Sequence, residues 1–521
     1  MTEASDELVL AVDCGTQSVR ALIVDLKGNI VAKRQRALDA YTAAQEGWLE
    51  HGAEAFWTAS AAVCRGLWVE HADLKPRVKG MAVTTQRGSL TLVDQSGKPL
   101  RPFIIWLDQR RAHRSPSIPA WWRLVFTAAR VSGTVDHLVK EAELNWIAEH
   151  EPERLRRAHK ALLVSGWLNY RLTGRFVDSA ASQVGYLPFD YKRQAWARSW
   201  DWKWRALGAR REQMPDLAPV GSILGGLTRD AAEATGLPGG LPVVAAAADK
   251  ACEILGAGAI TPDVGAVSYG TTATINVTTP RYLESTPFIP PYPAALPGQF
   301  VVEIQIFRGF WMVSWFKQQF GHPEVAAAPA EGVAPEALFD RLVKGVPPGS
   351  QGLMLQPYWT PGVRTPGPDA RGAVIGFTDA HTRAHLYRAI LEGLGYALRE
   401  GAERIQARSR ILITSLRVSG GGSQSDAAMQ ATADIFNRPA SRPHTFETAG
   451  LGAAIAASVG LGLHRDFPAA VGEMTRLGAT FEPNPAHAAL YEELYAQVYL
   501  RMYRRLSPLY GSLQRILRPS A

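Results

Sequence analysis

Residues 11–24 read AVDCGTQSVRALIV, and this stretch decides the fold that the sequence predicts. Apolar residues alternate on both sides of a bend that carries an acid, a glycine and a threonine, Asp13, Gly15 and Thr16. Such alternation is typical of strands, and the second run ends in the turn Lys27-Gly28-Asn29. A bend built from small residues lets a ligand approach the backbone closely. The stretch therefore predicts a strand–turn–strand unit that accommodates phosphate.

The same pattern returns in the second half of the chain, where residues 266–279 read AVSYGTTATINVTT. The two stretches align without gaps and share Ala-Val, followed two residues later by Gly-Thr. Chance similarity between two hairpins is the alternative explanation. A chain of 521 residues is, however, too long for one core and is expected to form two domains. We therefore predict a duplicated architecture with one glycine turn in each half.

Composition and charge narrow the class of protein. No apolar run approaches the roughly 20 residues of a membrane helix, and the N-terminus lacks the pattern of a signal peptide. Three cysteines, at positions 14, 64 and 252, have no metal-ligand spacing, which favours a reduced, cytoplasmic setting. The net charge of +8 either attracts anionic ligands or reflects a solvated basic surface. Without a dense Lys/Arg block, we expect neither a nucleic-acid nor a membrane partner.

A third glycine-rich loop lies in the segment RVSGGGSQSD. Gly420, Gly421 and Gly422 follow a predicted strand, and Ser423, Ser425 or Asp426 can cap the helix that comes next. Bare N–H groups at a helix start favour an anion or a closely packed nucleotide. The segment is neither a Walker A motif nor GxGxxG, so a plain loop is the alternative.

Two aspartates are candidates for the chemistry. Asp249 ends the apolar run PVVAAAADK, which predicts a buried strand, and ligands bind beyond strand ends in α/β sheets. It either takes a proton from a substrate hydroxyl or caps the helix that starts at Lys250. Asp13 either braces its own turn or holds the water shell of Mg²⁺.

Taken together, these motifs resemble the FGGY family of carbohydrate kinases over nearly the full length of the chain. DCGTQSVR resembles the family's phosphate turn, AADKA its catalytic-aspartate segment, and GVRTPGPDARG its Gly-Glu-Arg-Thr-Pro loop, with Val363 in place of Glu. Residues 372–392, GAVIGFTDAHTRAHLYRAILE, follow a family signature in order, with Phe377 as a departure. VSGGGSQSDAAMQATADI resembles the adenosine loop, and ETAGLGAAIAASVGLG the helix that follows it.

The resemblance implies an α/β fold of two ribonuclease H-like domains of the actin and sugar-kinase superfamily, with ATP and sugar in the cleft between them. The domains are expected at residues 1–250, with the phosphate turn and sugar site, and 251–521, with the nucleotide site. Asp249 is then the general base of an ATP-dependent sugar phosphorylation, and Asp13 acts near Mg²⁺. The residues expected at ATP are Gly15, Thr16, Gln17, Ser18, Arg20, Gly270, Thr271, Gly309, Gly420, Gly421, Gly422 and Ser425.

The expected substrate residues leave the sugar open. They are Gln86, Arg87, Trp106, Asp108 and Asp249. Glycerol kinases usually carry Arg-Glu, and xylulokinases Met-His, where this chain has Arg87-Gly88. It therefore keeps the arginine of the glycerol kinases and matches neither group at Gly88. IIWLDQR and GWLEH are xylulokinase-like, and Trp106 either packs against a sugar or belongs to the core. We expect a ketose such as xylulose, with glycerol or another polyol as the alternative.

Two other classes stay open on the same fold. One is a catalytically silent sugar sensor, which loss of Asp13 or Asp249 would indicate, and both are present. The other is an actin- or Hsp70-like ATPase, which the 372–392 signature disfavours. The sequence displays no interface for the homodimer that is common among such kinases.

Overall fold

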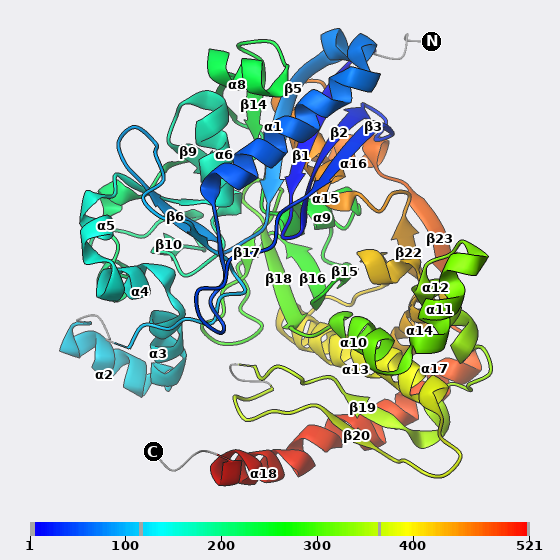
Figure 1. Ribbon diagram of the computed structural model, residues 1–521. Helices are drawn as coiled ribbons and strands as arrows, with labels where there is room; N and C mark the ends of the chain where they lie inside the picture. The colour runs from blue at the N-terminus through cyan, green and yellow to red at the C-terminus, as the bar shows by residue number, and fades with distance from the viewer. Residues whose placement is uncertain (1–5, 114–117, 363–365, 518–521) are drawn as a thin grey trace.

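The first sheet is built around the quoted hairpin in the computed structural model, which describes residues 6–113, 118–362 and 366–517 (Figure 1). β1 (Leu8–Cys14), buried throughout, pairs antiparallel with β2 (Ser18–Asp25) and parallel with β5 (Val78–Thr85). The strand order is β13-β14-β5-β1-β2-β3. The edge strands are β3 (Ile30–Ala37) and β13 (Ile223–Gly226), and β14 (Pro242–Ala245) lies between β13 and β5.

The second sheet repeats this arrangement. β15 (Val264–Tyr269) pairs antiparallel with β16 (Ala273–Thr279) and parallel with β21 (Ser415–Ser419). The order β17-β18-β16-β15-β21-β22-β23 reproduces that of the first sheet, with β17 as an added edge strand. The remaining strands are β17 (Tyr292–Pro293), β18 (Phe300–Ile306), β22 (Ala440–Pro443) and β23 (Leu477–Phe481). The predicted duplication is therefore confirmed, with each glycine turn at the end of a central strand.

Helices cover both faces of the first sheet. Its one face carries α1 (Ala53–Glu70), α6 (Val164–Thr173) and α8 (Arg229–Thr235). The other face carries α15 (Thr448–Gly460), which packs on β1 and β5 and against α9 (Asp249–Gly256), with α16 (Phe467–Met474) beside it. A Cβ added at Gly452 would lie 1.9 Å from the Cys252 carbonyl oxygen, so the α9–α15 contact requires glycine. The predicted domain boundary at residue 250 stays a prediction.

The second sheet has its own core around the long helix α13 (Arg383–Ser409), which contacts β16, β18 and β19. Buried aromatic rings of Phe316, Tyr387 and Tyr396 fill this core. The other helices of this half are α10 (Trp311–Phe320), α11 (His322–Glu331), α12 (Pro335–Val343), α14 (Asp426–Phe436), α17 (Pro485–Leu494) and α18 (Leu500–Leu517), with the short strands β19 (Met354–Gln356) and β20 (Ala373–Ile375).

An additional layer lies beside the first sheet, at the left in Figure 1. Its sheet has the order β4-β7-β6-β8. Its strands are β4 (Glu50–His51), β7 (Phe103–Ile104), β6 (Leu90–Val93) and β8 (Lys160–Leu163). Its helices are α2 (Ala120–Ala128), α3 (Ser132–Glu141), α4 (Glu143–His150), α5 (Pro152–Arg157) and α7 (Trp202–Ala206), and short strands β9 (Val177–Ser179), β10 (Phe189–Asp190), β11 (Ala195–Trp196) and β12 (Asp216–Ala218) complete it.

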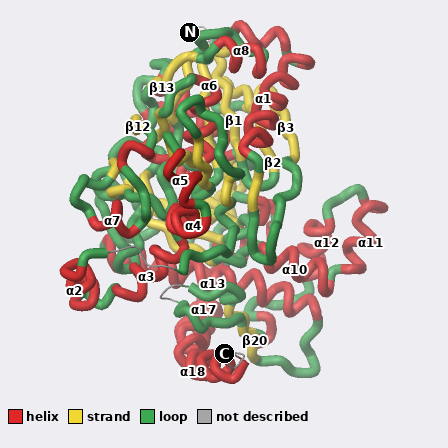
Figure 2. The backbone as a smooth tube through the Cα atoms, turned by 60° about the vertical axis from the view of Figure 1, so that its left-hand side comes forward, coloured by secondary structure: helices red, strands yellow, loops and turns green. Residues whose placement is uncertain are grey.

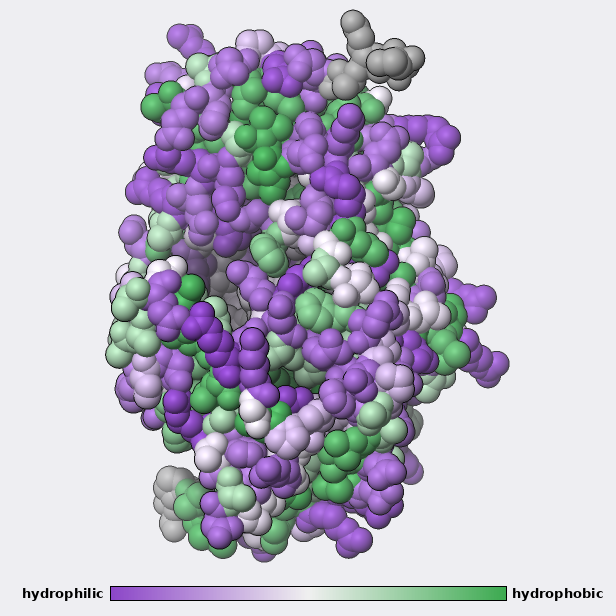
Figure 3. Space-filling model, turned by 90° about the vertical axis from the view of Figure 1, so that its right-hand side faces the viewer, coloured by the Kyte–Doolittle hydropathy of each residue, from purple (hydrophilic) through white to green (hydrophobic). Residues whose placement is uncertain are grey.

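The surface of the molecule is mixed in character. Figure 2 shows α2 and α11 projecting on opposite sides of the chain. The face in Figure 3 is mainly hydrophilic, carries its hydrophobic residues in separate groups, and is hollowed between the upper and lower halves. Within the described ranges, no helix combines the length and the apolar character needed to cross a membrane.

Candidate active site

The first glycine turn brings three of the predicted site residues together. The Thr16 hydroxyl donates to Gln86 Oε1 at 3.3 Å and accepts a hydrogen bond from Trp106 Nε1 at 3.0 Å. The Gln86 N–H donates to the Cys14 carbonyl at 3.0 Å, which fixes the segment after β5 against the turn. Gln86 Nε2 is buried without a hydrogen-bond partner among the described residues, so this amide keeps a donor for a ligand.

The rest of the first turn lies nearer to solvent. The Gly15 N–H donates to the Ser18 carbonyl at 3.0 Å, and the Ser18 hydroxyl accepts from Gln35 Nε2 at 3.0 Å. The Gln17 carbonyl accepts from the Leu38 N–H at 2.9 Å. These contacts close the bend and leave the Thr16 hydroxyl on the side of Trp106.

The second glycine turn gathers the predicted nucleotide residues of the other half. The Phe310 N–H donates to the Gly270 carbonyl at 3.0 Å, and the Trp311 N–H to the Thr271 carbonyl at 3.3 Å. Gly309 therefore lies against this turn, and a Cβ there would meet the Ala273 backbone nitrogen at 2.1 Å.

The triple-glycine loop lies beside the same turn. Gly420 has φ of +82°, which favours glycine, and a Cβ there would lie 2.7 Å from the Tyr269 carbonyl oxygen. A Cβ at Gly422 would meet the Phe310 ring at 2.3 Å, whereas one at Gly421 would meet nothing within 4 Å. The backbone at Gly421 is thus open to a ligand.

Ser425 caps α14, as one of the predicted alternatives has it. Its hydroxyl accepts from the Ala428 N–H at 3.1 Å and donates to Asp340 Oδ1 at 2.5 Å. Burial raises the pKa of the Asp340 carboxyl. Asp340, on α12, was not predicted from the sequence.

Asp249 is the first residue of α9 and lies where the two halves meet. The predicted strand ends earlier than expected, at Ala245, because only Val243–Ala245 pair with β5. Ala248 is the N-cap residue of α9, so the alternative that Asp249 is the N-cap is wrong. Asp249 Oδ1 nevertheless accepts a hydrogen bond from the Lys250 N–H at 2.7 Å. Lys250 Nζ reaches the Ser268 hydroxyl on β15 at 2.7 Å. The first turn of α9 thus contacts the second central hairpin directly, and the Asp249 charge acts on Asp13 of the first (Figure 1).

The charges of two further carboxylates, Asp249 and Glu447, act on Asp13. Burial raises the pKa of Asp13 to about 7. The positive charge of Arg20 lowers this pKa, and the negative charges of Asp249 and Glu447 also raise it. Burial also raises the pKa of Asp249, against the lowering effect of Arg87 and Lys250. Arg20 Nη1 lies 3.3 Å from Asp13 Oδ2, and Arg20 Nε lies 3.5 Å from Glu447. The cluster favours a ligand that brings positive charge.

Asp13 fits a Mg²⁺ site of the kind that the sequence suggests. Among the residues that the structure describes, its Oδ2 contacts Arg20 alone, at 3.3 Å. Burial and the neighbouring carboxylates raise the pKa of Asp13, and a divalent cation would lower it. No group of three or more His, Cys, Asp or Glu side chains that could hold a metal occurs in the described part of the chain. Mg²⁺ at Asp13 would therefore depend on water and phosphate oxygens, which it accepts readily.

Arg87 follows β5 but is held by the second half of the chain. Its Nη1 and Nη2 donate to the two Glu303 carboxylate oxygens at 3.2 and 3.1 Å, and its guanidinium carbon lies 5.3 Å from the centroid of the Tyr292 ring. Gly88 has φ of +69°, so its backbone favours glycine, and a Cβ there would lie 3.5 Å from the Trp106 Cβ, an ordinary van der Waals contact.

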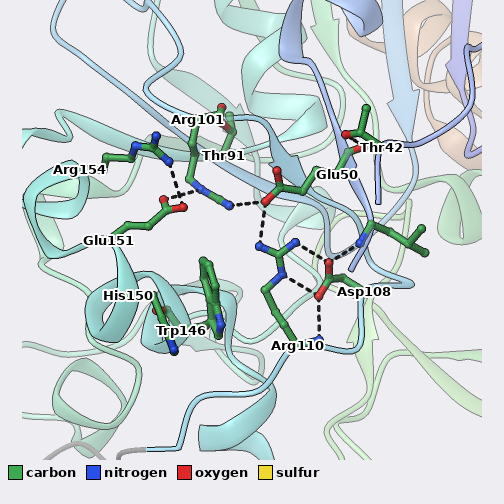
Figure 4. A network of polar contacts seen from close by, with 11 residues as sticks. Thr42, Glu50, Thr91, Arg101, Asp108, Arg110, Trp146, His150, Glu151 and Arg154 are labelled. Atoms are coloured by element: carbon green, nitrogen blue, oxygen red, sulfur yellow. Dashed lines mark hydrogen bonds and ion pairs between the residues drawn. The ribbon is translucent and has the colours of Figure 1, made fainter. Parts of the chain in front are cut away.

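Asp108 is held within a network of ion pairs that includes Arg110, Glu50 and Arg101 (Figure 4). Its oxygens accept from Arg110 Nε and Nη2, both at 2.8 Å, and from the Leu49 N–H at 2.6 Å. Arg110 also donates to Glu50 at 2.8 Å and stacks on Trp146. A substrate hydroxyl at Asp108 would have to share these oxygens, and a role for Asp108 in substrate binding stays a prediction.

Glu303, Tyr292, Asp340 and Glu447 were missed by sequence reasoning. A lone glutamate in the apolar strand FVVEIQI was the available signal for Glu303. Val363, Arg364 and Thr365 of the predicted Gly-Glu-Arg-Thr-Pro-like loop lie outside the described residues.

Comparisons with known proteins agree with this architecture. A xylulose kinase of Lactococcus lactis is 29% identical over 507 residues, covering 96% of this chain and 97% of that protein. A glycerol kinase of Rhodospirillum rubrum is 30% identical over 501 residues, covering 94% and 97%. The crystal structure of a xylulose kinase from Rhodospirillum rubrum superposes with a TM-score of 0.81 at 26% identity, covering 97% and 100%. The expected α/β fold of two actin and sugar-kinase superfamily domains is confirmed.

Family models account for most of the chain. Residues 8–256 match the N-terminal domain, and residues 265–461 the C-terminal domain, of the FGGY family of carbohydrate kinases. The chain therefore belongs to the FGGY family of carbohydrate kinases.

Proposed function

We propose that this carbohydrate kinase transfers the terminal phosphoryl group of Mg-ATP to a hydroxyl of a ketose, with xylulose as the leading substrate. The observation that carries the proposal is the position of Asp249. Asp249 begins α9, whose first turn contacts the second glycine-turn hairpin. Its charge interacts with Asp13 of the first hairpin and with Arg87. A carboxylate there can take a proton from a sugar hydroxyl on one side while phosphate lies on the other.

The raised pKa of Asp249 suits this role. Burial favours its protonated form, so the carboxylate is a stronger base than an exposed aspartate. Phosphoryl transfer needs little further covalent help, because in-line placement and charge neutralisation supply most of the rate enhancement. Mg²⁺, held by Asp13, would supply part of that neutralisation.

The nucleotide is placed in the second half on this proposal. Gly270, Thr271 and Gly309 form one continuous backbone surface that suits phosphates, and the open backbone at Gly421 suits the adenosine. Thr16 would contact the transferred phosphoryl group from the first half.

The sugar is assigned to the side of Thr16 that faces Gln86 and Trp106. Both of these side chains contact the Thr16 hydroxyl, Gln86 Nε2 has no partner among the described residues, and Arg87 follows Gln86 in the chain. Gly88 leaves room beside Trp106 that a larger residue would fill, which favours a substrate longer than glycerol. Because similar proteins are named xylulose kinase and glycerol kinase, a polyol such as glycerol is the alternative substrate.

A substrate screen tests the proposal. Purified protein with Mg-ATP would be assayed for ADP formation and sugar phosphate with glycerol, erythritol, xylulose and ribulose, and without sugar. We expect the highest kcat/KM with xylulose. Phosphorylation of glycerol alone would contradict the ketose assignment, and sugar binding without ADP formation would indicate a silent sensor. ATP hydrolysis that no sugar accelerates would favour an ATPase of the actin or Hsp70 kind.

A further inference from the structure

Arg87 connects the two halves of the molecule next to Gln86, at the proposed sugar site. It belongs to the first half by sequence, yet both of its terminal nitrogens are bound by Glu303 of β18 in the second. Tyr292 of the edge strand β17 stacks against the same guanidinium. The geometry of Arg87 is therefore set by residues from across the interface between the halves.

Glu303 is an unusual residue for its position. Its side chain is only 5% exposed, in a strand whose other residues are mostly apolar. A buried carboxylate is costly unless it is paired, and a two-point bond to arginine is among the strongest pairings available to it. Retaining a glutamate here makes sense if the arginine must be held in one orientation.

The surrounding charges explain why Arg87 needs such a partner. Asp249 is attracted to Arg87 and also faces Lys250 and Glu253 on α9 and Asp13 on β1. An arginine without Glu303 would be drawn toward the Asp249 carboxylate. A direct pair between them would occupy the oxygen that must receive the sugar proton and would remove Arg87 from the sugar.

We propose that Glu303 is a positioning residue for the sugar, which holds Arg87 away from Asp249 and presents its remaining N–H groups to a substrate hydroxyl. This inference rests on the proposed function. Glu303 accepts one N–H from each terminal nitrogen, which leaves three of the five guanidinium donors for other partners. Because the pair spans the two halves, sugar affinity depends on their approach to one another.

Nearby contacts also join the two halves of the molecule. Gln194 Nε2 donates to the Gln299 carbonyl at 2.7 Å, and the Tyr191 ring lies 5.8 Å from that of Tyr292. The Arg87–Glu303 pair is thus supported on one side by further contacts between the halves. Removing the Glu303 charge should leave these other contacts between the halves in place and free the Arg87 side chain to change its orientation.

Glu303→Gln tests the proposal, with the sugar that the wild-type protein accepts. We expect the sugar KM to rise at least tenfold, and kcat to fall by less than the KM rises. The Kd for ATP should stay within twofold of wild type. Glu303→Asp, which keeps the charge, should recover part of the lost affinity.

A matched control distinguishes a positioning role of Glu303 from the general effect of losing a glutamate–arginine ion pair. Glu324 binds Arg383 at two points, at 2.7 and 2.8 Å, within the second half alone. Glu324→Gln should leave the sugar KM unchanged. If Glu303→Gln lowers the melting temperature below the assay temperature, Tyr292→Leu removes the stacking surface instead and should also raise the sugar KM.

Three results bear on the inference differently. A sugar KM within twofold of wild type in Glu303→Gln would overturn it. A loss of ATP affinity in proportion to the loss of sugar affinity would also overturn it, because that pattern marks a structural role. Absence of sugar phosphorylation by the wild-type protein would instead contradict the proposed function.

Discussion

Asp13 and Asp249 illustrate, at the scale of single residues, how burial adjusts carboxylates for chemistry. Asp13 is the second-last residue of β1, whereas Asp249 begins the helix that follows β14, and burial raises the pKa of each. Their positions could be predicted from the sequence, because an acid that ends an apolar run stands out. Their electrostatic partners could not, since Glu447 is 434 positions from Asp13 in the numbering (447 − 13) and Arg87 pairs with a residue 216 positions away.

Glu143 provides a pH-dependent test of the same principle. It begins α4, and burial, with the Asp108 and Glu141 charges, raises its pKa from 4.5 to about 8. The folded state therefore binds more protons than the unfolded state across this range, and the free energy of unfolding falls as pH rises from about 4.5 to about 8. Glu143→Gln imitates the protonated form. We expect nearly equal stability at pH 4 and a variant more stable by about 4 kcal/mol at pH 8.5, measured by chemical denaturation, because each unit of pKa shift corresponds to about 1.4 kcal/mol.

An exposed glutamate serves as the control for this prediction. Glu46 lies on the surface, and Glu46→Gln should change the free energy of unfolding by no more than about 0.5 kcal/mol. A constant difference between Glu143→Gln and wild type at both pH values would contradict the predicted titration.

At the scale of elements, the two hairpins were the most predictable part of the fold. Gly28, in the predicted turn after β2, has φ of +76°, and the Gly15 and Gly270 turns close their hairpins as expected. The position of α15 could not be predicted. Its sequence TAGLGAAIAASVG is apolar and small on every side, which indicates burial but not against which sheet.

The loop between β21 and α14 gives an element-scale prediction. A Cβ at Gly421 meets nothing within 4 Å and its φ is not positive, so Gly421→Ala should fold normally. If adenosine lies against this backbone, the added methyl group blocks it. We expect the KM for ATP to rise about tenfold with an unchanged melting temperature, measured by initial rates and thermal unfolding.

Gly472, in α16, is the matched control, because a Cβ there also meets nothing within 4 Å. Gly472→Ala should leave the KM for ATP unchanged, and the melting temperature should stay the same or rise slightly because alanine favours the helix. An ATP KM that Gly421→Ala leaves at the wild-type level would place the nucleotide elsewhere.

At the scale of the whole molecule, contacts between distant segments hold the halves together. Lys33 Nζ binds Glu447 at 2.8 Å, and Arg476 donates to the Lys27 carbonyl and to Asn29 Oδ1, both at 2.6 Å. Repetition of the hairpin predicted that two halves exist. It could not predict these pairs, because ion pairs between segments follow from the docked geometry and leave no periodic signal.

The most direct measurement is phosphoryl transfer by Asp249→Asn, with a sugar that the wild-type protein accepts and with ATP binding measured separately. Asparagine keeps the shape of the side chain but cannot accept the hydroxyl proton. We expect kcat to fall by about 10³-fold, with the Kd for ATP within twofold of wild type. Wild-type turnover in this variant would contradict the claim that Asp249 is the base.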